Sequence, residues 1–160
     1  MLNHLEQMEQ FAHENNISLF IDSLPKEMSG FYYRNVKYGI RSITLSNNLD
    51  TTAEKICILA EELEHFISTP EDLFVASHSV REKYEKMARF CAVKRLMPFE
   101  KLINAKLLSI NNSFELADYL NITVDFLQAG IKAYKDHFGL SVPYKDFIIY
   151  FDPFDIEKAR

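Results

Sequence analysis

The sequence is poor in the residues that make a chain flexible or cross-linked. Only four glycines and five prolines occur among its 160 residues, which leaves little material for a flexible linker or a disordered tail. It has two cysteines, Cys57 and Cys91, and both lie among apolar residues in helix-like segments. This arrangement predicts two buried thiols in a reducing compartment and argues against a disulfide framework.

Long apolar runs and an excess of basic charge are also missing. No stretch approaches the run of about 18 apolar residues that a membrane span needs, and the polar start, MLNHLEQMEQFAHENN, is unlike a signal peptide. The 18 basic residues are outnumbered by 23 acidic ones, so the net charge is −5. General attraction to nucleic acid or to an anionic membrane is therefore not expected, and the sequence predicts a cytoplasmic protein.

The remaining composition is that of an ordinary globular protein. Hydrophobic residues make up 48% of the chain and charged residues 26%. A chain of 160 residues suits one domain and can bury roughly 70% of the surface that its unfolded form exposes. We therefore expect a single domain over residues 1–160 with its own hydrophobic core.

The N-terminal part shows one helical pattern followed by strand patterns. Apolar residues at positions 2, 5, 8 and 11 recur at helical spacing, so an amphipathic helix is expected at the start. Residues 17–25 read ISLFIDSLP, a short β-branched strand that ends at proline. Two further strand-like segments flank a polar turn at 35–39, and the second, 40–46, alternates like a half-buried strand.

Most of the remaining chain is predicted to be helical. Thr51 with Glu54, and Ser79 with Glu82, match the capping-box pattern that begins a helix. The last segment, 141–160, is an apolar tail that could form a strand or dock on the rest. The expected helices are 52–68, 79–96, one that begins near Pro98, 113–120 and 124–138. A helix, three strands and then several helices indicate an α+β fold.

The helix predicted at 52–68 carries the most informative motif. Glu61, Glu62 and His65 form E-E-x-x-H, which differs at one position from the H-E-x-x-H of zinc peptidases. Residues 61 and 65 are one helical turn apart and about 40° apart around the axis, so both can reach one metal ion. Glu62 lies beside them, where it can take a proton from a water molecule at the metal.

An acidic helix surface that happens to contain a histidine would show the same sequence motif. Two features favour a site. The preceding turn, ICILA at 56–60, is apolar on every side and therefore predicted to be buried. Cys57 and Ile58 lie below Glu61 and His65 on the same face, so that face is expected to be covered. Covered carboxylates must be neutralised, paired or bound to a cation.

A third ligand is needed, because catalytic zinc usually has three protein ligands and one open position. Glu85 is the candidate. It shares its predicted helix face with Ala88 and Ala92, and small residues let two helices approach closely. It follows His65 by 20 residues, which is enough for a loop and one helical turn. The alternative is a solvated glutamate on a helix surface.

These residues resemble the ImmA/IrrE family of metallo-endopeptidases, which occur mainly with phages and integrative elements. The resemblance rests more on the order and spacing of its motifs than on any one of them. The matching segments are Gly30-Phe31-Tyr32, Ile43-Thr44-Leu45, Ile58 to His65, Tyr84-Glu85 with Ala88, Phe90-Cys91-Ala92, Leu96-Met97-Pro98, Glu115-Leu116-Ala117 and Tyr134 to Gly139.

The resemblance implies a small zincin-like metallopeptidase fold, with a short antiparallel sheet packed on the metal-binding helix. It implies one divalent metal, zinc or alternatively manganese, held by Glu61, His65 and Glu85, with Glu62 as the general base. Its implied partner is a protein substrate, a helix-turn-helix repressor whose cleavage releases a phage or mobile element. Residues 1–97 would hold the strand pair and the two metal helices, and 98–140 a helical, helix-turn-helix-like subdomain.

Two residues depart from the family pattern. Glu61 stands where histidine is expected, and Glu64 stands where glycine is usual, which places a third carboxylate nearby. With Glu61, His65 and Glu85 as ligands, two negative charges cancel those of a divalent ion. A neutral centre is a weaker Lewis acid than one of charge +1, and carboxylate-rich sites favour harder ions such as manganese.

The expected reaction is hydrolysis of a peptide bond. Glu62 would take a proton from water and later protonate the leaving amine. The edge of the strand pair around Ser42–Ser46 is expected to hold an extended substrate by strand addition. The group that stabilises the oxyanion stays open among four candidates, Tyr32, Tyr33, His78 and Tyr84.

Two other functions remain open. Residues 114–134 have the pattern of a helix-turn-helix, as in a DNA-binding regulator, but residues 100–160 carry seven basic and nine acidic residues, 7 − 9 = −2. The second alternative is a module that kept the fold, lost the chemistry and regulates a repressor by docking alone. In that case Glu61 and Glu64 would mark the loss.

Overall fold

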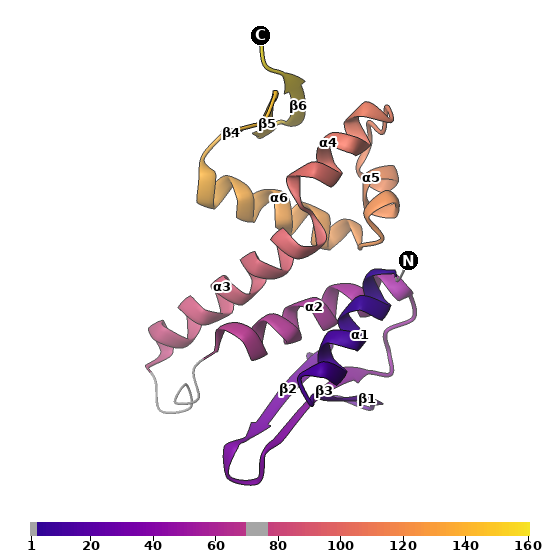
Figure 1. Ribbon diagram of the computed structural model, residues 1–160, viewed down its shortest axis with the longest axis vertical. Helices are drawn as coiled ribbons and strands as arrows, with labels where there is room; N and C mark the ends of the chain where they lie inside the picture. Colours follow the sequence, from indigo (N-terminus) through magenta and orange to yellow (C-terminus); the bar gives the residue numbers. More distant parts are fainter. Residues whose placement is uncertain (1–2, 70–76) are drawn as a thin grey trace. The chain divides into compact units, whose positions relative to one another are not determined.

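The computed structural model describes residues 3–69 and 77–160 (Figure 1). Within them the chain forms six α-helices, one 3-10 helix and six strands, which confirms the α+β class and is compatible with a small zincin-like fold. In chain order they are α1 (His4–Glu14), β1 (Ser18–Asp22), β2 (Gly30–Asn35), η1 (Val36–Tyr38), β3 (Ile40–Ser46), α2 (Thr52–Ser68), α3 (His78–Leu96), α4 (Phe99–Leu107), α5 (Ser113–Leu120), α6 (Val124–Phe138), β4 (Ser141–Tyr144), β5 (Phe147–Phe151) and β6 (Phe154–Lys158).

These elements divide into two compact units, Met1–Ala92 and Val93–Arg160. The first holds both helices that carry the E-E-x-x-H motif and Glu85. The second holds the predicted helix-turn-helix pair and the C-terminal strands. None of the helices in the described ranges is long and apolar enough to cross a lipid bilayer.

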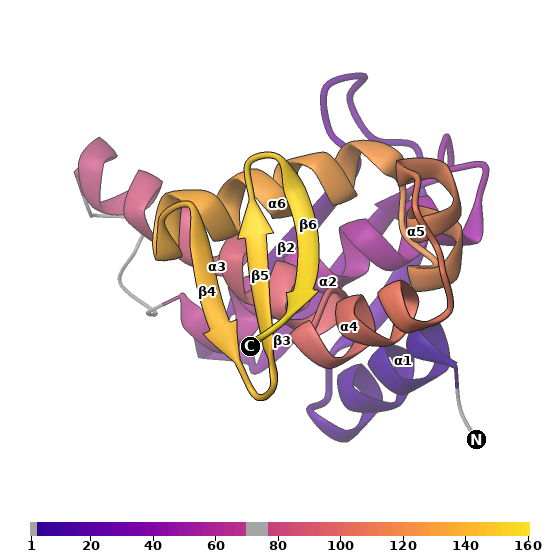
Figure 2. The same ribbon diagram turned by 90° about the horizontal axis from the view of Figure 1, so that it is seen from above.

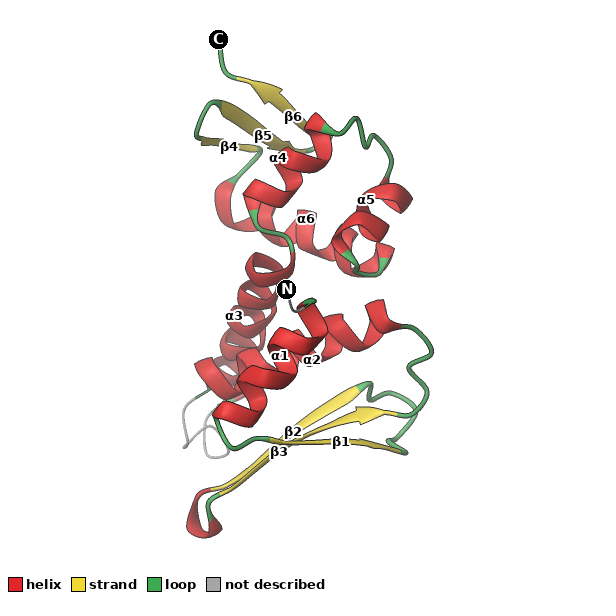
Figure 3. Cartoon of the chain, turned by 45° about the vertical axis from the view of Figure 1, so that its right-hand side comes forward, coloured by secondary structure: helices red, strands yellow, loops and turns green. Residues whose placement is uncertain are grey.

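The sheet of the first unit has the order β1-β3-β2, with β1 parallel and β2 antiparallel to β3. Helices α1 and α2 lie over one face of it (Figure 3). The antiparallel sheet expected from the resemblance is therefore a mixed one, because β1 pairs along the side of β3 that the β2–β3 hairpin leaves open. β3 is consequently the central strand, bonded on both sides.

The core of the first unit lies between this sheet and the two helices. The side chains that fill it are buried, and they come from α1, β3 and α2: Met8, Ala12, Ile43, Leu45, Ile56, Leu59 and Leu63. Alternation along β3 points Ile43 and Leu45 to the helices, as expected for a half-buried strand. Burial of one helix stripe and one sheet face holds α2 in a fixed orientation.

Helix α2 begins and ends where the sequence predicts. The Thr51 hydroxyl accepts a hydrogen bond from the Glu54 N–H, and the Glu54 carboxylate accepts one from the Thr51 N–H at 2.8 Å. This reciprocal cap satisfies two N–H groups that the first helical turn leaves open. The helix ends at Ser68, and Thr69 is already extended; Pro70 lies outside the described residues.

The predicted start of the next helix is wrong by one residue. α3 begins at His78, so Ser79 lies inside its first turn and does not cap it with Glu82. The hydroxyl of Ser79 lies instead 3.1 Å from that of Ser77. A serine followed three residues later by glutamate is a common pattern inside a helix as well as at its start, and here the helix already includes it.

The second unit packs three helices and a three-stranded sheet around an aromatic and aliphatic core. α5 and α6 have the predicted bounds, and Pro98 precedes α4 as its N-cap residue. Tyr134 is buried on α6 and its hydroxyl donates to the Met97 carbonyl at 2.8 Å. Burial raises the pKa of Tyr134 far above its ordinary value. Other buried residues of this unit include Leu102, Leu116, Leu120 and Leu127.

The C-terminal segment forms a small sheet that docks on α6, where the Phe151 and Tyr134 ring centroids are 5.6 Å apart. Strands β4, β5 and β6 pair antiparallel in that order and lie side by side (Figure 2). The aromatic side chains of Tyr144, Phe147 and Phe154 lie on one face of this sheet and alternate along the strands with side chains of the other face. The apolar character of the segment in the sequence therefore reflects strand pairing. β4 was not predicted, because Pro143 and a four-residue length give a weak strand pattern.

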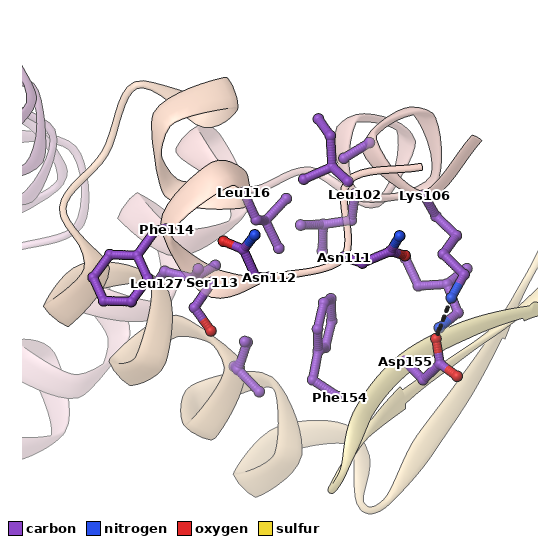
Figure 4. Close-up of a pocket in the computed structure, with 14 residues that line it drawn as sticks. Leu102, Lys106, Asn111, Asn112, Ser113, Phe114, Leu116, Leu127, Phe154 and Asp155 are labelled. Carbon is purple, nitrogen blue, oxygen red and sulfur yellow. Dashed lines mark hydrogen bonds and ion pairs between the residues drawn. The ribbon is translucent and has the colours of Figure 1, made fainter. Parts of the chain in front are cut away.

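A hollow of about 380 Å³ lies in the second unit (Figure 4). Its walls are mainly aliphatic and aromatic side chains from α4, α5, α6 and β6, including Leu102, Leu116, Leu127 and Phe154. An ion pair between Lys106 and Asp155, with 2.6 Å between Nζ and Oδ1, borders one side. No member of the E-E-x-x-H motif lines this hollow.

Glycine at position 30 permits the closest approach of β2 to α2. A Cβ atom there would overlap the Ile58 Cγ2 atom and lie 3.1 Å from the Glu62 Cγ atom. We expect Gly30→Ala to lower the free energy of unfolding by about 1–3 kcal/mol, because the added methyl group overpacks this contact. Urea denaturation measures the change.

The double variant Gly30→Ala, Ile58→Ala is the control. Removing the Ile58 side chain makes room for the new methyl group, so the two substitutions should cost less together than the sum of their separate effects. Strictly additive costs would show that the two positions are not in steric contact.

Candidate functional site

Helix α2 presents the motif on a partly covered face. Cys57 and Ala60 lie buried below it, with 4% and 0% of their surfaces exposed. The side chains of Glu61 and His65 retain 27% and 19% of their exposure. The expectation that Cys57 and Ile58 cover this face is confirmed in part, because Cys57 is buried but Ile58 is only half-buried, and solvent still reaches Glu61 and His65.

Helix α3 brings Glu85 to His65. The distance between His65 Nε2 and Glu85 Oε2 is 3.3 Å. Ala88 and Ala92, one and two turns further along α3, are fully buried, so the stripe of small residues does pack closely. The structure thus places together the two side chains that the sequence separates by 20 residues.

Arg89 is a member of the site that the sequence reasoning missed. Its Nε lies 3.8 Å from Glu61 Oε1, and its side chain is 64% exposed. Arg89 follows Glu85 by four residues on α3, so both lie on one helix face. That spacing was the available signal, because a residue four positions after a proposed ligand must face the same neighbours.

The pKa values of Glu61 and Glu62 are raised above their ordinary value. Burial raises the pKa of Glu61, and the charge of Glu85 adds to this, whereas Arg89 and His65 lower it. Burial raises the pKa of Glu62 to about 7, and the charges of Glu61 and Glu85 contribute further. The site therefore holds more negative charge than its own positive groups neutralise.

The backbone of β2 borders the site and contacts Glu62 directly. The Tyr32 N–H donates a hydrogen bond to the Glu62 carboxylate, which partly opposes the rise in its pKa. Ser46 N–H donates to the Ser29 carbonyl at 2.9 Å, so Ser29 belongs to a hydrogen-bonded pair of β2 and β3. Because such pairs alternate in an antiparallel ladder, Gly30, Tyr32 and Arg34 direct their backbone groups away from β3.

The sequence prediction that Ser42–Ser46 forms a substrate-holding edge is wrong. That segment is in β3, which is bonded to β1 on one side and to β2 on the other. Periodicity reveals which residues face the core but not which strand is central. The strand edge that lies beside α2 belongs to β2.

Glu64, the second departure from the family pattern, is buried with 4% of its surface exposed. Its carboxyl is not among the groups that shift the pKa of Glu61 or Glu62. The extra carboxylate expected near the site therefore lies toward the interior of the unit. His78, one of the four oxyanion candidates, is 83% exposed and pairs with Glu82 at 3.4 Å.

The side chains assemble only part of the metal-ligand set that the family resemblance implies. In the described ranges, no group of three His, Cys, Asp or Glu side chains converges on one point. His65 faces Glu85 and Glu61 faces Arg89, as two separate pairs. The chemistry of the donors does fit a divalent cation, because α2 and α3 supply one imidazole and two carboxylates with excess negative charge.

Comparison with known families gives one match. Residues 5–132 match the model of the IrrE N-terminal-like domain of peptidase family M78. The match covers α1 to most of α6 and leaves out the C-terminal sheet. A search of curated proteins finds none that matches the chain. Assignment to a metallopeptidase family implies a divalent metal, usually zinc, and Glu61, His65 and Glu85 stay the predicted ligands.

The raised pKa of Glu62 predicts how the metal-free protein responds to pH. Glu62 binds its proton more tightly in the folded protein than in the unfolded chain, whose ordinary value is 4.5. This contribution to stability is therefore complete below about pH 4.5 and is lost as the pH rises through about 7. With a chelator present, we expect Glu62→Gln to be more stable than wild type at pH 8 by about 1–3 kcal/mol, and equally stable near pH 4.5. Urea denaturation across this pH range measures the difference.

Glu82→Gln is the matched control, because Glu82 is a largely exposed glutamate on α3. It should keep the pH dependence of the wild type. A Glu62→Gln profile parallel to that of the wild type would mean that Glu62 ionises as freely in the folded protein as in the unfolded chain.

Proposed function

Because the chain belongs to peptidase family M78, we propose that it is a metal-dependent endopeptidase of a protein substrate, a helix-turn-helix repressor of a phage or mobile element. The observation that carries this proposal is the 3.3 Å approach of Glu85 to His65, with Glu61 and Glu62 beside them. Cys57 and Cys91 form no disulfide, which fits a cytoplasmic location; Cys57 is buried as predicted, whereas Cys91 is only half-buried.

Glu61, His65 and Glu85 would hold the metal, which we take to be zinc, with manganese as the alternative. When bound, the metal would polarise the scissile carbonyl and make water more acidic. Its charge would also offset the negative charge of the carboxylates, of which Glu61 and Glu62 have raised pKa values. The cost of gathering these groups in a partly buried place would then be offset.

Glu62 would act as the general base. Its carboxylate takes a proton from the attacking water as the oxygen bonds to the carbonyl carbon, and gives that proton to the amine nitrogen as the C–N bond breaks. A pKa of about 7 suits a group that must both accept and donate near neutral pH. The Tyr32 N–H holds the carboxylate against β2, which fixes its position relative to the substrate.

The β2 strand would position the substrate chain. The backbone groups of Gly30, Tyr32 and Arg34 face the side on which Glu62 lies. Because Gly30 and Tyr32 already contact α2, an extended peptide would pair with the part of this edge that α2 leaves open, with its scissile bond near Glu62. This assignment replaces the Ser42–Ser46 edge.

Arg89 would offset the extra negative charge that Glu61 brings in place of histidine. Glu61 in place of histidine removes one unit of charge from the centre, and the guanidinium of Arg89 supplies one beside it. Arg89 is therefore a further candidate for stabilising negative charge that develops on the carbonyl oxygen. The four candidates named from the sequence did not include it.

The proposal is tested by cleavage of the cognate repressor with the metal-loaded protein. Glu62→Gln removes the base and should lower the cleavage rate by at least about 100-fold, because positioned acid–base catalysis typically contributes that much. Metal content is measured on the same samples. A Glu62→Gln protein that holds metal and cuts as fast as wild type would rule out the role of Glu62.

The ligand assignment is tested by calorimetric titration with zinc. Glu61→His should strengthen binding by about tenfold, about 1.4 kcal/mol, because imidazole suits zinc better than a second carboxylate. An unchanged or weaker affinity would remove Glu61 from the ligand set.

Arg89→Gln tests the role of Glu61 independently, again by calorimetric titration with zinc. It removes the cation that faces Glu61, so zinc binding should also become tighter. Lys83→Gln, an exposed change of the same charge on α3, is the control and should have little effect.

A repressor-binding module without catalysis is the second candidate. It is favoured by the two internal pairs, His65 with Glu85 and Glu61 with Arg89, which neutralise part of the charge without a metal. The two functions differ in the content of the purified protein. An enzyme holds about one ion per chain, whereas a docking module holds none under zinc or manganese supplementation.

A further inference from the structure

Strand β1 forms an apolar edge that nothing in the described parts of the chain covers. It lies at one margin of the sheet and pairs only with β3 (Figure 1). All five of its residues are exposed, including Leu19 at 36%, Phe20 at 55% and Ile21 at 63%. A flat, apolar edge strand is a template for pairing with another strand, and proteins usually protect such edges with charges, proline or a covering segment.

The open hydrogen-bonding groups of β1 can be assigned to particular residues. The Asp22 carbonyl accepts from the Asn47 N–H at 2.9 Å, so Asp22 directs its backbone toward β3. Because backbone direction alternates along a strand, Ser18 and Phe20 do the same. Leu19 and Ile21 therefore direct both their N–H and C=O groups to the open edge.

We propose that two copies of this chain associate through antiparallel pairing of their β1 strands, with Phe20 on the twofold axis. In this register Leu19 of one copy lies opposite Ile21 of the other. Both residues direct their backbone groups outward, so the two Leu19–Ile21 pairs can each form two hydrogen bonds. The two three-stranded sheets would then join into one of six strands.

The side chains of β1 are complementary to themselves in this register. On the face away from the helices, Phe20 meets Phe20 of the second copy at a non-hydrogen-bonded position, where side chains approach most closely. Phe20 is also in register with Thr44, and Thr44 with Phe31, so one row of side chains would run across all six strands.

The helix-facing side offers a matching recess. Glu9, His13 and residues 16–19 line a hollow beside the start of β1, of about 500 Å³. Ile21 of the second copy lies opposite Leu19 and would enter this hollow. Its aliphatic side chain would cover Leu19, which is 36% exposed, whereas Ile17 is already buried.

The charges of β1 permit a second copy as the occupant of this edge. Asp22 is the one charged residue of β1, and in this register it lies opposite the neutral Ser18 of the other copy. The two Asp22 carboxylates are then at opposite ends of the ribbon, about 14 Å apart. This exceeds the screening length of about 8 Å at physiological salt, so they repel each other little.

The interface is small, which sets the expected affinity. A ribbon of five residues per chain buries less than the roughly 1,200 Å² of a standard stable interface. We therefore expect a reversible dimer with a dissociation constant in the range of about 1–100 µM.

The first test is sedimentation of the full chain between about 1 and 500 µM. Wild type should change from monomer to dimer over this range. Phe20→Lys places two ammonium groups side by side and should raise the dissociation constant at least tenfold, about 1.4 kcal/mol. Phe31→Lys, an equal change of charge on the same sheet face but two strands from the contact, should leave dimerisation unchanged. A wild type that stays monomeric, or an equal loss with both variants, would overturn the proposal.

Ile21→Pro separates dimerisation from folding. Proline removes the N–H of Ile21, which points outward and is not used by β3, so the melting temperature should change little while the dimer weakens. A dimer that persists in this variant would contradict the proposed edge.

The second test fixes the register by disulfide formation in a background of Cys57→Ala and Cys91→Ala. Phe20→Cys places two thiols at a position where Cα atoms are about 4.5 Å apart, within the range of disulfides. It should form a disulfide-linked dimer on mild oxidation. Leu19→Cys lies about 7–8 Å from its equivalent and should not. Efficient linkage at position 19 and none at position 20 would contradict the register.

Discussion

The first unit is organised by a local excess of negative charge in a partly covered place. Burial raises the pKa of Glu61 and of Glu62, and the negative charge of Glu85, whose own side chain is 61% exposed, raises both further. Carboxylates so placed must be protonated, paired or bound to a cation. His65 and Arg89 pair with Glu85 and Glu61, so the protein neutralises part of this charge itself. A divalent cation would neutralise the rest, which is why the same group of residues suits a metallopeptidase.

The sequence predicted the helices well because their signals are local. The Thr51–Glu54 cap gave the start of α2, and helical spacing gave the exact bounds of α5 and α6. Close approach of Glu85 to His65 was also predictable, since the alanine stripe on α3 permits it. The strand order was not predictable. Alternation along β3 shows which side chains are buried, but a strand with neighbours on both sides has the same alternation as one with a single neighbour.

Arg89 belongs to the site but is not part of the family pattern. The resemblance directed attention to residues that match, and Arg89 matches nothing in it. Its importance follows from position alone, because a residue four after Glu85 shares its helix face. Glu61 and Arg89 are best considered together. A glutamate and an arginine in contact have a net charge of zero, like a neutral histidine. Unlike a histidine, the two side chains can move separately when a metal or a substrate binds.

The two margins of the first sheet have different surroundings, and this difference assigns them different roles. The β2 margin lies against α2, where Gly30 has no side chain and Tyr32 donates its N–H to Glu62. A peptide bound there is beside the reacting groups. The β1 margin carries exposed apolar side chains and one charge, and no member of the E-E-x-x-H motif lies on it. Pairing of two copies at β1 would leave both β2 margins accessible, because β3 separates the two strands. Association through one edge is therefore compatible with substrate binding at the other.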